Sequence, residues 1–130
     1  MKKLLIWGTG KLAKQFLSNG YCGEIIGFIE TNKTVNMFAN KPVYSSNEIP
    51  KKYDFILVAN SYAEEIFDLC EQLNIEQSKL IFLYGFKKQI GYTDLVVLRE
   101  ILLDKNYSNY CAEFGLVENT FLQKDIVKYE

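Results

Sequence analysis

Strand-length apolar runs alternate with amphipathic segments along the first 90 residues. The runs at 24–30 and 54–59 are apolar almost throughout, which is typical of parallel strands buried on both faces. Shorter strand-like runs lie at 4–6, 42–44 and 79–84. Apolar residues at helical spacing predict one helix from Lys11 to Gly20 and another ending at Leu73. This alternation predicts an α/β fold with a doubly wound parallel sheet of about five strands in the order 3-2-1-4-5.

Two connections depart from the repeating pattern. The segment 31–41 is polar and too short for a full crossover helix, so we expect a turn there. Pro42 begins the next strand, a position that predicts the edge of the sheet. Ser45 and Glu48 have the spacing of a capping box and predict a helix of about one turn before Pro50.

The C-terminal part has a different character. A helix is predicted over 93–104, and its apolar residues cover more of its circumference than one sheet face needs. We therefore expect this helix to form a homodimer contact or to dock on a following domain. A polar break then precedes a predicted strand at 110–116. The chain is accordingly divided into a domain at 1–90 and a helical extension at 91–130.

Composition narrows the classes of function. The 130 residues are 48% hydrophobic, enough for one sizeable core. Fifteen basic and 16 acidic residues give a net charge of −1, so no basic field indicates nucleic acid or a membrane surface. No apolar stretch reaches the roughly 20 residues that span a bilayer. The sequence contains no histidine, which excludes Ser-His-Asp and Cys-His nucleophiles and histidine-based metal sites.

The cysteines and the N-terminus bear on the cellular compartment. Three widely spaced cysteines predict free thiols in a reducing cytoplasm rather than a disulfide frame or a zinc site. Met1, Lys2 and Lys3 lead directly into the first strand, unlike a secretory signal. We therefore expect a cytoplasmic protein that carries no metal ion.

The strongest functional signal is the glycine-rich turn between the first strand and the first helix. Gly8 would let the chain reverse tightly, Gly10 would let the backbone approach a phosphate, and Ala13 would let the helix pack on the sheet. The free N–H groups at the helix start would then face an anion. The turn predicts a nucleotide-binding site, and a tight but empty turn is the alternative.

Glu30 adds a second feature of such a site. It closes the second strand 20 residues after Gly10, where dinucleotide folds place a carboxylate on the ribose hydroxyls. Its charge disfavours a 2′-phosphate, so the position favours NAD over NADP. The alternative is a carboxylate that only ends a strand at the solvent edge.

The loop after the run at 54–59 would open into the same crevice if the sheet has the order given above. Asn60, Ser61 and Tyr62 would then form the second wall of the pocket. Ser61 and Glu64 have capping-box spacing, so Ser61 is first of all a predicted helix cap. A ligand contact from the Ser61 hydroxyl or the Tyr62 amide is the functional alternative.

Taken in order, residues 7–10, 27–30, 42–44 and 54–59 resemble the small Rossmann-like domains attached to bacterial saccharide-modifying proteins. That group includes the N-terminal domains of PglD-type sugar acetyltransferases, the nucleotide-binding part of polysaccharide epimerase/dehydratases, and the leading modules of sugar O-methyltransferases. The resemblance covers about residues 1–90 and implies contact with a nucleotide or a nucleotide-sugar. The residues that it implies are Gly8, Thr9, Gly10, Lys11, Leu12, Glu30, Asn60 and Ser61.

A second resemblance lies near the C-terminus. Residues 112–115, followed by 116–121, look like the opening of a SAM-dependent methyltransferase of the macrocin O-methyltransferase type, which implies the truncated start of such a domain. Too few residues follow Gly115 to build a SAM site, so we expect no methyl transfer.

The favoured hypothesis is a module that binds NAD or a UDP-sugar and serves surface polysaccharide biosynthesis with a saccharide-modifying catalytic domain or chain. One alternative is a small NAD-dependent sugar-nucleotide oxidoreductase or epimerase, with Tyr62 or Lys11 near the reacting carbon. Another is an oligomerisation module with an empty pocket, which rests on the apolar helix at 93–104.

Overall fold

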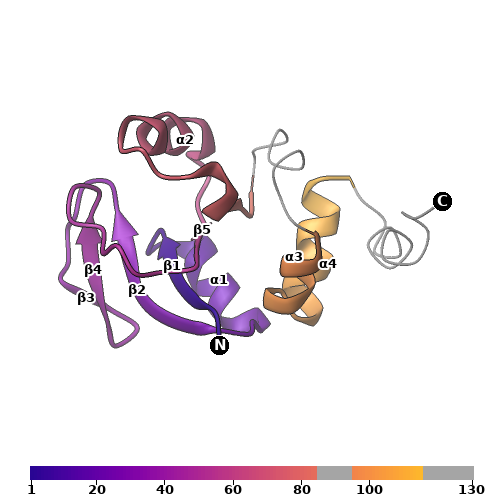
Figure 1. Cartoon of the computed structure of the whole chain (residues 1–130). Helices are drawn as coiled ribbons and strands as arrows, with labels where there is room; N and C mark the ends of the chain where they lie inside the picture. Colours follow the sequence, from indigo (N-terminus) through magenta and orange to yellow (C-terminus); the bar gives the residue numbers. More distant parts are fainter. Residues whose placement is uncertain (85–94, 116–130) are drawn as a thin grey trace.

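A six-stranded, mostly parallel sheet forms the centre of the molecule, as seen in a computed structural model that describes residues 1–84 and 95–115 (Figure 1). The strands are β1 (Lys3–Trp7), β2 (Glu24–Glu30), β3 (Met37–Phe38), β4 (Lys41–Ser45), β5 (Phe55–Val58) and β6 (Leu80–Phe82). The helices are α1 (Lys11–Asn19), α2 (Ala63–Gln72), α3 (Leu95–Ile101) and α4 (Asp104–Glu113), with a 3-10 turn η1 (Gln77–Lys79). The strand order is β3-β4-β2-β1-β5-β6, and β3 pairs antiparallel with β4.

Helices cover both faces of the sheet because successive side chains of each strand point to opposite faces. On β1, Leu4 and Ile6 pack in one apolar cluster with α1, α3 and α4, while Leu5 and Trp7 pack in the other with α2. β1 is shielded from solvent on both faces of the sheet, since all four of these side chains are 0–1% exposed. Figure 1 shows α3 and α4 beside each other on the α1 side. The expected α/β fold is therefore present as three layers.

The sheet differs from the predicted five-stranded order because it has an additional strand. The five expected strands correspond to β1, β2, β4, β5 and β6, and the turn expected within 31–41 instead contains β3. Pro42 is consequently not on an edge strand, because β4 lies between β2 and β3. Ala39 and Asn40 both have positive φ, 49° and 63°, as the two-residue hairpin turn between β3 and β4 requires. An Ala-Asn pair is a weak signal for such a turn, so the hairpin was not predicted.

The helical spacing of apolar residues predicted α1 and α2 correctly, whereas the capping-box spacing at Ser45 and Glu48 did not predict a helix. Lys11 begins α1 and Gly20 follows it with φ of 100°, as a glycine C-cap allows. Only one half of the Ser45 and Glu48 capping box forms, around a turn and not a helix: the Ser45 N–H donates to the Glu48 carboxylate at 3.0 Å, whereas the Glu48 N–H donates to the Ser45 carbonyl and not to its hydroxyl. The predicted helix of one turn before Pro50 is therefore absent.

The C-terminal segment folds as two helices on the main core. The predicted helix over 93–104 is seen from Leu95 to Ile101, and its first two residues lie outside the described ranges. The predicted strand at 110–116 is wrong, because residues 110–113 complete α4. Tyr110 of α4 and Phe114, the residue after it, pack on each other in the core. Tyr110 is 2% exposed, and its ring centroid lies 4.5 Å from that of Phe114. Residues 112 and 113, where the methyltransferase resemblance begins, are therefore helical, and residues 116–130 lie outside the described part.

Asn106 fixes α4 to the C-terminal end of α1. Its side-chain amide donates to the Phe16 carbonyl at 2.9 Å and to the Gly20 carbonyl at 2.6 Å. The side chain is buried, and these are carbonyls that the last turn of α1 cannot satisfy internally. Because of this contact, α4 belongs to the same core as α1.

Candidate functional site

A pocket of about 610 Å³ opens at the carboxyl ends of β1, β2 and β5. Residues 7–12 run from the end of β1 into α1, residues 29–32 run from the end of β2 into the next loop, and residues 59–62 follow β5. Glu65, Ile66 and Leu69 of α2 complete the lining. All nine residues that the sequence singled out line this pocket. Its volume lies in the range of about 300–1,000 Å³ that is typical of small-molecule sites.

Gly8 and Gly10 of the turn differ in whether the fold itself requires a glycine. Gly8 has φ of 131°, and a Cβ there would lie 2.7 Å from the Ala59 carbonyl oxygen. The Gly8 N–H also donates to the Ile29 carbonyl at 2.9 Å, so this residue closes the turn against both neighbouring strands. Gly10 has an ordinary extended conformation, and a Cβ there would meet nothing within 4 Å. The fold therefore requires glycine at position 8, whereas Gly10 lines the pocket and a Cβ at that position would meet open space.

The N-terminal end of α1 is built to attract an anion. Gly10 is the N-cap, no side chain caps the helix, and its first turn contains no acidic residue. The first backbone N–H groups of a helix have no intrahelical partner and carry part of the positive end of the helix dipole. Lys11 adds an exposed positive charge at the first helical position, and both Lys11 and Leu12 line the pocket.

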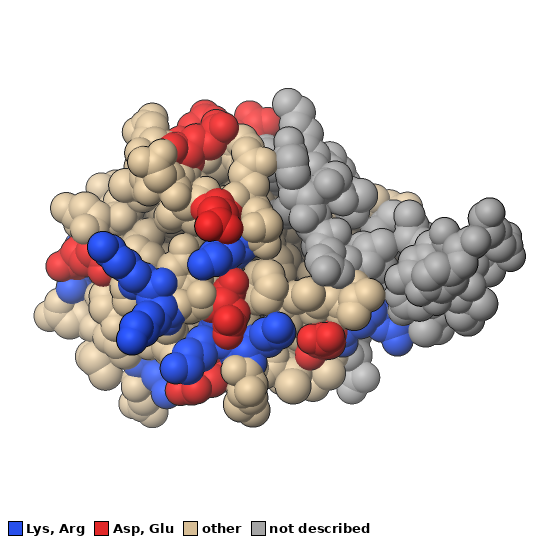
Figure 2. All heavy atoms as spheres, in the orientation of Figure 1, with Lys and Arg blue, Asp and Glu red and all other residues tan. Residues whose placement is uncertain are grey.

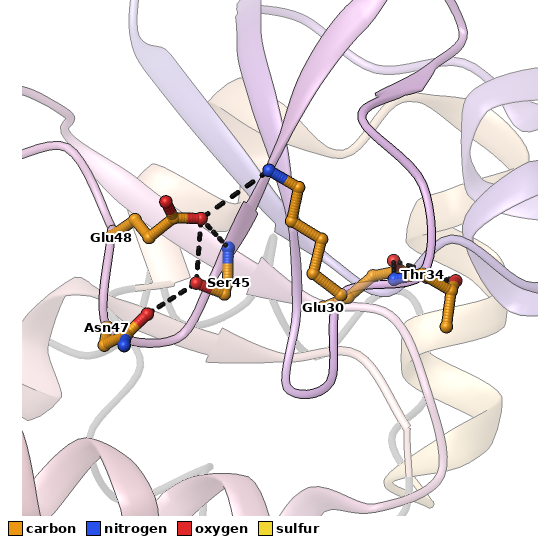
Figure 3. Close-up of polar contacts among 6 residues, drawn as sticks. Glu30, Thr34, Ser45, Asn47 and Glu48 are labelled. Carbon is orange, nitrogen blue, oxygen red and sulfur yellow. Dashed lines mark hydrogen bonds and ion pairs between the residues drawn. The ribbon is translucent and has the colours of Figure 1, made fainter.

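Glu30 is held by the two loops on either side of it. Its carboxylate accepts hydrogen bonds from the Thr9 hydroxyl at 2.5 Å and from the Thr34 N–H at 2.9 Å, as Figure 3 shows for Thr34. Burial alone would raise the pKa of the Glu30 carboxyl, but the Thr34 N–H, the Thr9 and Thr34 hydroxyls and the Val35 N–H together lower it below 4.5. The acid thus joins the glycine turn to the loop after β2.

That loop makes a second contact with the turn after β4. The Lys33 ammonium lies 3.6 Å from the Glu48 carboxylate, which also accepts the Ser45 hydroxyl at 2.8 Å (Figure 3). The Ser45 N–H and hydroxyl and the Lys33 charge lower the pKa of the Glu48 carboxyl. The loop after β2 is therefore held mainly by the hydrogen bonds to Glu30, and the exposed Lys33–Glu48 ion pair adds a weaker contact.

In the loop after β5, the side-chain amide of Asn60 bonds to the backbone of β1 and of its own loop. The Asn60 side chain donates to the Trp7 carbonyl at 3.3 Å and accepts the Tyr62 N–H at 2.9 Å. The Tyr62 amide, predicted as a ligand donor, is therefore already engaged. The predicted Ser61 cap does not form either, since Tyr62 is the N-cap of α2 and no side chain caps it. The Ser61 hydroxyl is left exposed at the pocket.

Sequence reasoning missed the parts of the lining that come from the end of β1 and from α2. Trp7 lines the pocket although it is 1% exposed, and its indole N–H donates to the Thr31 hydroxyl at 3.1 Å. Glu65, Ile66 and Leu69 contribute from α2. Their helical spacing from Tyr62 was a usable signal, because it places them on the same face as a residue already assigned to the pocket.

The described residues give little support to several other kinds of site. Cys70 is buried, and burial raises the pKa of its thiol to about 12, so it stays protonated and is no nucleophile. Within 1–84 and 95–115, no group of three or more His, Cys, Asp or Glu side chains could hold a metal ion. No helix of these ranges has the length and apolarity to cross a membrane. On the face shown in Figure 2, acidic side chains lie among the basic ones.

Comparison with known families adds one finding to this geometry. The model of the C2185-like N-terminal domain matches residues 1–81, which run from the start of the chain into β6. The chain belongs to the C2185-like N-terminal domain family. No curated protein matches it. The matched range contains the whole lining of the pocket and ends before α3 and α4.

Proposed function

We propose that this C2185-like domain is a Rossmann-like module that binds the diphosphate of a nucleotide or nucleotide-sugar at the N-terminal end of α1. The sheet supports the Rossmann-like assignment in that β2 and β5 flank β1, so the chain's connections diverge at its carboxyl end. Ligands of open α/β sheets bind at such a switch point. The pocket lies at that position.

One observation carries the proposal: Gly10 combines open space with an uncapped helix start. A helix N-cap is usually Ser, Thr, Asp or Asn, whose side chain satisfies a free N–H. Here the cap lacks a side chain, Lys11 follows, and a Cβ would project into unfilled space. A diphosphate placed there would accept the N–H groups and pair with the lysine.

Glu30 supports a ribose beside the diphosphate. Ribose hydroxyls donating to this carboxylate would take the place of the Thr9 or Thr34 hydroxyls that it now accepts. Its negative charge would repel a 2′-phosphate, so NAD and UDP-sugars remain the proposed ligands rather than NADP.

The wider role follows from the resemblance of the sequence to saccharide-modifying proteins. In this proposal the module acts in the cytoplasm in surface polysaccharide biosynthesis, with a partner catalytic domain or chain. A homodimer contact through 93–104 is part of the same proposal. The apolar surface available for this homodimer contact is smaller than the sequence suggested. Leu98 and Ile101 are fully buried in the core, which leaves Val96 and Leu103, 45% and 41% exposed.

Calorimetric titration of the whole chain with UDP, UDP-glucose, ADP, NAD and NADP tests the proposal. Trp7 is the single tryptophan of the sequence and lines the pocket, so its fluorescence gives an independent readout. A ligand at 100 times its dissociation constant should also add about 2.7 kcal/mol to the free energy of unfolding. NADH oxidation by a keto-sugar nucleotide would instead support the oxidoreductase alternative.

The Gly10→Ala variant provides the decisive comparison. Its unfolding free energy should fall by no more than about 1 kcal/mol, the typical cost of exchanging a glycine N-cap for the poorer alanine cap. Diphosphate affinity should fall at least about tenfold, because the methyl group occupies the phosphate position. Absence of nucleotide binding by the wild type, or equal affinity in the variant, would remove the basis of the proposal.

A further inference from the structure

One face of α2 forms its own part of the pocket. Tyr62, Glu65, Ile66 and Leu69 line the pocket at intervals of three, one and three residues, which places them on one side of the helix. Ile66 is buried and Leu69 is half-buried, whereas Tyr62 is 65% exposed at the mouth. A ligand here would meet an apolar floor, an accessible aromatic ring and a carboxylate.

The charge of this part is unsuitable for phosphate. Glu64 and Glu65 both lie in the first turn of α2, where free backbone N–H groups would otherwise attract an anion. The two carboxylates repel a phosphate group at this helix start. A neutral group that offers hydrogen-bond donors fits the site better.

Two polar groups of this part are available to a ligand. In the part of the chain that the structure describes, the Glu65 carboxylate and the Ser61 hydroxyl have no ion pair or hydrogen-bond partner. The neighbouring Asn60 side chain differs, because both of its polar atoms are bonded to backbone. Glu65 and Ser61 are therefore the polar groups left for recognition beside the Tyr62 ring.

We propose that this α2 face binds the glycosyl group of a nucleoside diphosphate sugar. The inference rests on the proposed function, since it places the diphosphate at α1. A pyranose ring carries C–H groups on its faces and hydroxyls around its rim. The C–H groups pack on the Tyr62 ring and on Leu69, and the hydroxyls donate to the Glu65 carboxylate and exchange hydrogen bonds with Ser61. The pocket thus recognises the sugar through α2 and the diphosphate through α1.

Paired titrations with and without the sugar test this assignment. The wild type is titrated with UDP, UDP-glucose and UDP-N-acetylglucosamine, and each UDP-sugar is compared with UDP. The better UDP-sugar should bind about tenfold more tightly than UDP, the gain expected from about one well-placed aromatic and one charged contact. Tyr62→Ala and Glu65→Gln should each remove most of that gain, measured as the ratio of UDP-sugar affinity to UDP affinity within the same variant.

Two matched variants control for general effects. Glu64→Gln removes the same charge from the same turn at a residue outside the pocket lining, and Tyr62→Phe keeps the ring. Both should retain the preference for the UDP-sugar. If UDP binds but neither UDP-sugar binds more tightly, the glycosyl assignment is wrong while the diphosphate site stands. If UDP does not bind, the glycosyl assignment fails, and if ADP and NAD do not bind either, the proposed function fails with it. Loss of NAD affinity in Tyr62→Ala without any UDP-sugar preference would assign the same face to a nicotinamide ring.

Discussion

Two helices begin at the same pocket, and their first turns have opposite electrostatic character. α1 starts from Gly10 with no acidic residue in its first turn and with Lys11 at its first position. α2 starts from Tyr62 and carries Glu64 and Glu65 in its first turn. In both cases no side chain caps the helix, so the backbone presents the same free N–H groups.

The difference means that side chains, and not backbone geometry alone, determine how strongly each helix start attracts an anion. A helix start favours negative charge by about 0.3–1 kcal/mol at an exposed position, and nearby side chains can reinforce or cancel this amount. Lys11 reinforces it at α1, whereas two glutamates already satisfy it at α2. The pocket therefore has one end suited to phosphate and one end suited to a neutral ligand group.

Substitution of the two glycines gives the largest expected contrast at the α1 end. Gly8→Ala places a Cβ 2.7 Å from the Ala59 carbonyl oxygen at φ of 131°. Strain and the backbone clash together should lower the free energy of unfolding by about 3 kcal/mol or more. Gly10→Ala should lower it by less than about 1 kcal/mol, as urea denaturation of both variants would show. A similar loss in both would mean that Gly10 is also required by the fold.

The C-terminal ends of α1 and α2 also differ, and a substitution there should have the next largest effect on the free energy of unfolding. α2 closes with its own backbone, since the Leu73 N–H donates to the Leu69 carbonyl, but α1 depends on the Asn106 amide from α4. Asn106→Ala leaves two buried carbonyls without this donor and should lower the unfolding free energy by about 2 kcal/mol. Lys105→Ala, an exposed neighbour on α4, is the control and should change it by less than about 0.5 kcal/mol. Equal values for the two variants would show that α4 does not support α1.

The charge at the start of α1 should affect binding more than stability. Lys11→Gln removes a cation at the pocket, and Lys14→Gln removes one from the same helix outside the lining. We expect diphosphate affinity to fall about fivefold in the first variant and less than about twofold in the second. The difference should shrink at high salt, because screening weakens exposed charges. Titrations at two ionic strengths would check both points, and equal losses would indicate a general charge effect.

The sequence revealed those parts of the fold and site that depend on local patterns. Unbroken apolar runs identified the buried strands β2 and β5, and the glycine turn with Glu30 identified two pocket loops. Parallel strands then bring their carboxyl ends to one edge, so residues far apart in sequence could be assigned to one pocket. The binding role of those residues stays a prediction.

The missed features depend on tertiary contacts that leave little trace in the sequence. β3 is two residues long and turns through Ala39, which rarely adopts positive φ. α4 begins with polar residues, so the sequence predicts that Asn106 lies on the surface. The residue is buried because its side chain donates to the carbonyls of Phe16 and Gly20, which are distant in sequence. The engagement of Glu30 by Thr9 and Thr34 is also invisible to a motif that only fixes spacing.

The pH dependence of Glu30 gives the smallest effect and completes the comparison of the two helix starts. Glu30 is a carboxylate bonded to the α1 turn, but Thr9 and Thr34 hold it as an acceptor. Because these bonds lower its pKa in the folded protein, ionised Glu30 stabilises the fold above its unfolded pKa near 4.5. This contribution is lost as the pH falls through the lower folded pKa.

Glu30→Gln should therefore flatten the acid side of the stability curve. Compared with the wild type, the variant should be less stable at neutral pH, and the difference should narrow as the pH falls below about 4.5. Glu48 also has a lowered pKa, but it is present in both proteins and its slope cancels in the difference. Urea midpoints across this pH range measure the effect, with Glu24→Gln at the exposed start of β2 as the control. A difference that stays constant with pH would mean that the Glu30 charge plays no part in joining the two loops.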